Sequence, residues 1–112
     1  MLDIKALTHT LTIAALELRA ELEAAQQEAD MQEENAHAIN AWTLAHEQNP
    51  LTTDAEMEEV YEVNERVCNR ASYARDIEDQ YRDVVEGLSD LLSNLSLLES
   101  LKEHYDEINE RG

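Results

Sequence analysis

Three carboxylates stand close together in the run Glu-Glu-Val-Tyr-Glu, at Glu58, Glu59 and Glu62. If the run is helical, carboxylates at this spacing share one face of the helix. Oxygen ligands of this kind can hold Mg²⁺, and bound Mg²⁺ can orient and activate a triphosphate. The chemistry that these residues would support is therefore metal-assisted hydrolysis of a nucleotide.

The Glu-Glu-x-x-Glu spacing resembles the motif of the all-helical nucleotide pyrophosphatases of the MazG type. That resemblance implies a carboxylate-metal enzyme with a Glu-x-x-Asp on the following helix. The chain departs from the pattern, because Glu86 and Asp90 are one residue too far apart, while Glu103 and Asp106 have the spacing but come late. Basic groups that would hold phosphates are also few. This enzyme is the third of three functional hypotheses.

Two other sets of residues could support catalysis or metal binding, but their patterns are less complete. Glu34 and His37 form a Glu-x-x-His, as in di-iron four-helix bundles, but such a site needs a second copy of the motif and two further carboxylates. A symmetric dimer could supply the second copy. Cys68 lies beside Val67 and is interpreted as a small core residue rather than a nucleophile. Neither a Gly-rich phosphate loop nor a catalytic triad is recognisable. We therefore expect no catalytic residue, metal or cofactor, and hence no enzyme.

The elements that must position these residues are helices. The 112 residues suffice for one domain, and the chain has two Gly, one Pro and no Phe. Ala, Leu, Glu and Gln favour helix throughout. Pro50 ends the first helix, and Thr53 with Glu56 forms a capping box that starts the second. We predict a single all-α domain over residues 1–112, with a helix over about 3–48, a turn at 49–53 and a helix over about 54–110.

Apolar residues recur in both helices at alternating steps of three and four, which is typical of coiled-coil packing. The two helices are therefore expected to form a long antiparallel hairpin. Counting from the turn places Gln32 near Arg70, a polar layer that would fix the register, with Glu28 or Glu33 as the partner of Arg70. The first predicted seam is Leu11, Ala15, Leu18, Leu22, Ala25, Ala29, Gln32, Ala36 and Ile39. The second is Val60, Val63, Val67, Arg70, Ala74, Ile77, Tyr81, Val84, Leu88, Leu91, Leu95, Leu98, Lys102 and Tyr105.

The end of the hairpin far from the turn is too apolar for a two-helix seam. We expect two hairpins to dimerise there into a four-helix bundle, since large exposed apolar patches mark interaction sites. Gly87 leaves a second possibility, because a kink or break there would allow a three-helix bundle within one chain. The predicted homodimer contacts are Leu7, Leu11, Leu92, Leu95, Leu98, Leu101 and Tyr105.

Charge is concentrated around the turn. The segment of residues 20–65, here called the acidic arm, has 13 carboxylates and no Lys or Arg, whereas the other 66 residues carry −5 of the net −18. Such a run is ordinarily a solvated face. In the hairpin, the arginines Arg66, Arg70, Arg75 and Arg82 would approach the acids Glu33, Glu34, Glu28 and Glu21 and neutralise a few of them.

A functional interpretation is mimicry of nucleic acid. About 23 residues per helix span roughly 35 Å, over which duplex DNA has on the order of 20 phosphates. In size, charge and helicity the chain resembles small acidic phage-encoded inhibitors, including anti-CRISPR proteins and restriction inhibitors. The resemblance implies a non-catalytic inhibitor that blocks a basic nucleic-acid-binding surface of another protein. The acids expected to contact that partner are Glu21, Glu23, Glu28, Asp30, Glu33, Glu34, Glu56, Glu58, Glu59, Glu62 and Glu65.

Trp42 has two interpretations: it closes the hairpin in a small cluster with Ile39 and Val60, or it anchors the partner. The second functional hypothesis is a coiled-coil adaptor or assembly chaperone that binds through Leu92, Leu97 and Leu101. Direct binding of nucleic acid or an anionic membrane is unfavourable at this charge. The lone Cys, with neither a basic leader nor a long apolar run at the N-terminus, predicts a cytoplasmic location, the host cytoplasm if the chain is viral.

Overall fold

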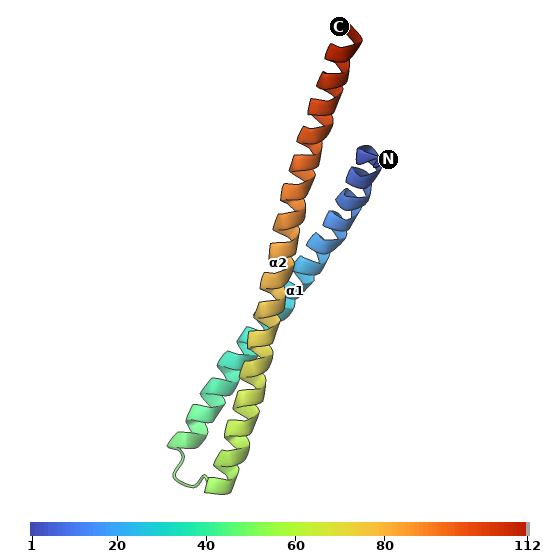
Figure 1. Cartoon of the computed structure of the whole chain (residues 1–112). Coiled ribbons are helices and arrows are strands. Elements are labelled where there is room, and N and C mark those ends of the chain that lie inside the picture. Colours follow the sequence, from blue (N-terminus) through green and yellow to red (C-terminus); the bar gives the residue numbers. More distant parts are fainter. Residues whose placement is uncertain (112) are drawn as a thin grey trace. The chain divides into compact units, whose positions relative to one another are not determined.

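The computed structural model describes residues 1–111, which form two long helices. Helix α1 spans Ile4–Gln48 (45 residues), and helix α2 spans Asp54–Arg111 (58 residues). They pack as an antiparallel hairpin, with α1 running from blue to green and α2 from green to red (Figure 1). The predicted all-α hairpin is therefore confirmed, with helix boundaries within one residue of the predicted ones.

Polar side chains define the helix ends. Asp3 Oδ1 accepts a hydrogen bond from the Ala6 amide at 3.2 Å, which caps α1. Thr53 Oγ1 accepts one from the Glu56 amide at 3.2 Å, so the predicted N-cap of α2 is formed. Between the helices, Asn49 Oδ1 accepts a bond from the Leu51 amide at 3.0 Å. These side chains satisfy backbone groups that a helix end and a tight turn leave unpaired.

Removing the α2 cap should destabilise the hairpin measurably. We expect Thr53→Ala to lower the free energy of unfolding by about 1 kcal/mol, because the Glu56 amide loses its acceptor. Urea denaturation followed by circular dichroism would measure the change. Thr52→Ala is the matched control, since no side-chain hydrogen bond of Thr52 is present in the described chain. Equal losses in the two variants would contradict the capping role.

Helix α2 continues through Gly87 without interruption. The three-helix bundle considered from the sequence is therefore not formed. No residue among those described has a positive φ, so Gly87 is not required for a special backbone conformation. A Cβ built at Gly87 would meet nothing within 4 Å, which places this position at an open surface.

The chain divides into two compact units, which are described separately. The turn unit is Leu22–Gln80, and the terminal unit is Met1–Glu21 with Tyr81–Gly112. The core of each is thin: the buried apolar side chains among residues 1–111 are Ala29 and Val60 in the turn unit, and Ala15 and Leu95 in the terminal unit. The turn unit also buries three polar side chains, Gln32, Thr43 and Glu78.

The seam predicted for α1 is confirmed, since all nine of its residues are buried or half-buried. The seam predicted for α2 consists of two columns, each a set of positions seven residues apart. The column that runs from Val60 to Leu95 is correct, since its six residues are buried or half-buried. The other column is correct at Val63, which is half-buried, and wrong from Arg70 onward, because its remaining residues are exposed: Arg70, Ile77, Val84, Leu91, Leu98 and Tyr105. The positions that turn toward α1 in their place are Asn64, Ala71, Glu78, Val85, Leu92 and Glu99, each one residue further along the chain.

Polar partners on α1 account for this rotation of α2. Asn64 Nδ2 donates to Thr43 Oγ1 at 2.9 Å and to Asn40 Oδ1 at 2.8 Å. Arg75, three residues before the buried Glu78, reaches two acids of α1. Buried polar groups must find partners, so these bonds select the column that contains Asn64 and Glu78. The more apolar column is left on the surface.

Candidate partner-binding surfaces

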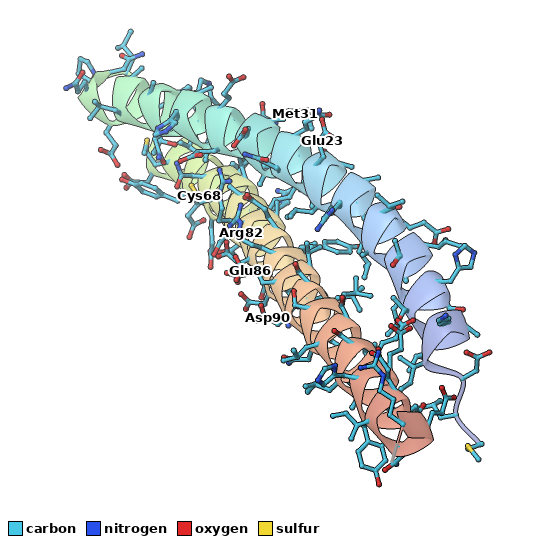
Figure 2. The ribbon with its side chains drawn as sticks, turned by 90° about the horizontal axis from the view of Figure 1, so that it is seen from above. Glu23, Met31, Cys68, Arg82, Glu86 and Asp90 are labelled. Atoms are coloured by element: carbon cyan, nitrogen blue, oxygen red, sulfur yellow. The ribbon has the colours of Figure 1, made fainter. Side chains whose placement is uncertain are left out.

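The acidic arm presents its carboxylates to solvent. All eleven acids predicted to contact a partner are exposed. Glu23 and Met31 project from α1 on the side away from α2 (Figure 2). Of the 13 acids between residues 20 and 65, salt bridges engage Asp30 and Glu33, which leaves eleven without a cationic partner in the described chain. The negative charge of the arm is therefore mostly uncompensated within the chain.

Arg75 makes the salt bridges of the arm. Its Nη2 lies 3.2 Å from Asp30 Oδ1 and 2.6 Å from Glu33 Oε2, and its Nη1 bonds the buried carboxylate of Glu78. The hydrogen bonds to Glu78 and then to Asp30 raise the pKa of Arg75 above its ordinary value, so the guanidinium stays charged. Of the acids that the arginines of α2 were expected to approach, Arg75 pairs with Glu33, and it also pairs with Asp30, which was not expected.

Gln32 and Arg70 do lie together, as the sequence predicts, but without an acid bound to Arg70. Both side chains line two neighbouring grooves of about 420 Å³ and about 290 Å³. Glu28 accepts a bond from Gln32 Nε2 at 2.9 Å and forms no salt bridge with Arg70 in the described chain. Gln32 is 8% exposed, and its Oε1 is buried with no hydrogen-bond partner. The polar layer is therefore only partly satisfied.

Trp42 lies at the edge of the larger groove, with Ile39 and Asn35. It is 40% exposed, and its ring packs edge-on against His46 with the centroids 4.5 Å apart. Nδ1 of His46 lies 2.9 Å from the Trp42 carbonyl oxygen, so this nitrogen carries the proton that is donated. One face of Trp42 is thus packed locally, while a large part of the ring remains available to a partner.

A second polar cluster near the turn was not predicted. Asn40, Thr43 and Asn64 form a hydrogen-bonded group, and the thiol of Cys68 lies 3.6 Å from Asn40 Oδ1. On the same helix as Asn64, the hydrogen bond from Tyr61 to Glu47 is the main cause that raises the pKa of Tyr61, with smaller contributions from desolvation and from the negative charge of Glu47. The available signal was the heptad spacing of Thr43 and Asn64, which continue the steps of three and four from Ile39 and Val60.

The terminal unit has a surface that is apolar and uncharged. The steps of three and four from Val84 continue without a break to Ile108 on the exposed side of α2. We call this set the second stripe: Val84, Gly87, Leu91, Asn94, Leu98, Leu101, Tyr105 and Ile108. Seven of the 25 residues from 84 to 108 are charged, and none of the seven falls on the second stripe. Exposed fractions on it reach 58% at Leu101 and 66% at Tyr105.

The residues predicted to form a dimer fall into two groups. Leu98, Leu101 and Tyr105 are exposed on the second stripe. The other four are partly or fully covered in this hairpin: Leu7, Leu11, Leu92 and Leu95. Of the adaptor residues, Leu97 is also exposed, at 59%.

The carboxylates with possible metal chemistry do not converge. Glu58, Glu59 and Glu62 are exposed, as are Glu34 and His37. Within residues 1–111, no three His, Cys, Asp or Glu side chains are grouped as a metal ion would require.

Neither described helix combines the length and the apolar character needed to cross a membrane. The chain matches no protein-family model, no curated protein and no solved structure.

Proposed function

We propose that the protein is a non-catalytic inhibitor whose acidic arm binds a basic, nucleic-acid-binding surface of another protein. The observation that carries the proposal is the exposure of the arm's carboxylates other than Asp30 and Glu33. These eleven acids, nine of the predicted contacts together with Glu47 and Asp54, have no cationic partner in the described chain. Dense fixed negative charge attracts basic surfaces over long range and speeds their encounter. Blockade would then be both steric and electrostatic.

Trp42 gives this surface an apolar component. It borders the groove that Arg70 and Gln32 also line, within the turn unit. Aromatic side chains beside charged rims are typical of the residues that dominate binding energy. A basic partner would therefore contact the exposed carboxylates of the arm and the exposed part of the Trp42 ring.

The proposal can be tested by capture of host proteins on the immobilised chain. We expect basic nucleic-acid-handling proteins to bind at about 0.1 M salt and to be lost at about 1 M, where the Debye length falls from about 10 Å to about 3 Å. Duplex DNA added as a competitor should release them. The variant that combines Glu58→Gln, Glu59→Gln, Glu62→Gln and Glu65→Gln should capture about tenfold less.

A matched control removes the same charge elsewhere. The changes Glu17→Gln, Glu86→Gln, Asp106→Asn and Glu110→Gln affect four exposed acids of the terminal unit. Both variants have a formal net charge of −14, four less negative than the parent chain. The control should capture as the parent does. A partner that binds all three proteins at both salt concentrations would overturn the proposal.

The exposed leucines of the terminal unit favour a second candidate, an adaptor or assembly chaperone that binds a partner through Leu97 and Leu101. Apolar contact is only weakly sensitive to salt, in contrast to carboxylate binding. The same capture experiment therefore separates the two. Loss of a salt-resistant partner on Leu97→Ser with Leu101→Ser, but not on the four Glu→Gln changes, is the result expected of an adaptor.

A further inference from the structure

The second stripe has the pattern of a coiled-coil seam that α1 does not use. The spacing between its successive residues alternates between three and four positions over about three and a half heptads. A pattern of this length indicates that the helix pairs with another helix. The side chains are apolar at six of eight positions, and the exceptions are Gly87 and Asn94. A helix with two adjacent seams is typical of a bundle, in which each helix packs against two neighbours.

We propose that two copies of the chain associate through the second stripe, with their α2 helices antiparallel and centred near residue 96. The self-complementary sizes along the stripe support this arrangement. Antiparallel pairing about residue 96 places Tyr105, the largest residue of the stripe, opposite Gly87, the smallest. The same alignment places Leu91 opposite Leu101 and Val84 opposite Ile108.

The parallel alternative fits the same residues poorly. It sets Gly87 against Gly87 and leaves a void, since no side chain fills that layer. It also sets Tyr105 against Tyr105, the bulkiest pair possible on this stripe. Open space beside Gly87, where an added Cβ meets nothing within 4 Å, is what the antiparallel partner's Tyr105 would occupy.

Charge favours the same choice. The turn unit has a formal charge of −12 and the terminal unit −6. Antiparallel overlap over residues 84–108 leaves the more acidic unit of each copy out of the contact, so the repulsion between copies is reduced. At the edge of the stripe it also brings Asp90 beside His104 of the second copy. The interface therefore needs no carboxylate to face another across its centre.

Cysteine pairing tests the alignment directly. Two proteins would be made in a Cys68→Ala background, one with Gly87→Cys and one with Tyr105→Cys, mixed in equal amounts and oxidised mildly. We expect the mixed disulfide between residues 87 and 105 to dominate by mass spectrometry, because their Cα atoms face each other in the antiparallel pair. Disulfides that join each variant mainly to itself would overturn the antiparallel alignment.

The association itself is tested by sedimentation of the parent chain, which should be a dimer at micromolar concentration. Leu91→Asp with Leu98→Asp should give a monomer that remains helical by circular dichroism. Ser93→Asp with Ser100→Asp, two exposed positions off the stripe, should remain dimeric. A monomeric parent chain, or a dimer unaffected by the changes on the stripe, would overturn the proposal. Neither result affects the acidic-arm proposal, which concerns the turn unit.

Discussion

Replacing Arg75 with Met is expected to lower the melting temperature of the hairpin by on the order of 10 °C. Glu78 is only 2% exposed, and its carboxylate is bonded to the Arg75 guanidinium. Met retains most of the apolar stem of Arg but not its charge, so the buried carboxylate loses a strong hydrogen bond. The bonds of Arg75 to Asp30 and Glu33 on α1 are lost as well.

A double variant separates the buried charge from the surface salt bridges. Arg75→Met combined with Glu78→Met should recover most of the lost stability, because apolar replacement of both ions removes the desolvation penalty. Arg66→Met is the control for loss of a single cation, since Arg66 is exposed and forms no salt bridge in the described chain. Thermal unfolding would be followed at 222 nm. A double variant as unstable as the single one would show that the contacts with Asp30 and Glu33 dominate.

The hairpin was predictable from sequence because each of its signals is local. Pro50 prevents continuation of α1, Thr53 caps α2, and the spacing of apolar residues along α1 identifies the face that is buried. Gly87 was the ambiguous point, and the uninterrupted spacing through it correctly indicated a continuous helix. Local propensity and periodicity therefore agree over nearly the whole chain, which is the condition for a reliable prediction.

The face that α2 turns toward α1 was harder to predict because apolarity alone points to the wrong column. Ile77 and Leu98 are more apolar than Glu78 and Glu99, which replace them in the seam, while Val84 and Leu91 give way to Val85 and Leu92, residues of the same type. What decides the outcome is pairing across the helices, as between Asn64 and Thr43. Such partners can be identified only once the register is known. An apolar column left outside is itself informative, because it points to a contact beyond the hairpin.

The exact partners of Arg75 were hard to predict for a related reason. Counting from the turn places Arg75 opposite the stretch near Glu28, whereas its side chain reaches Asp30 and Glu33, two and five residues nearer the turn than Glu28. The long, flexible side chain of Arg lets its guanidinium reach residues diagonally across a seam. The residue directly opposite on the other helix is therefore a poor guide to the partner of an Arg. The exposure of the arm was predictable because carboxylates without partners are rarely buried.

Gln32→Met is expected to raise the free energy of unfolding by about 1–2 kcal/mol. Gln32 is 8% exposed, and its Oε1 is buried without a hydrogen-bond donor. The desolvation cost of that oxygen exceeds what the single bond from Nε2 to Glu28 contributes, since Glu28 is itself exposed. Met has nearly the same shape and no polar group to satisfy. Gln27→Met, at an exposed position of α1, should leave stability unchanged.

A polar residue in a seam often fixes register at some cost in stability. Here the turn of five residues between Gln48 and Asp54 already holds the two helices in register, so Gln32 is not needed for that purpose. Gln32→Met should therefore stabilise the hairpin without changing its oligomeric state, measured by urea denaturation and sedimentation. A loss of stability would instead show that a bound water satisfies Oε1. A gain in stability accompanied by weaker capture of a partner would show that Gln32 is retained for the groove it shares with Arg70.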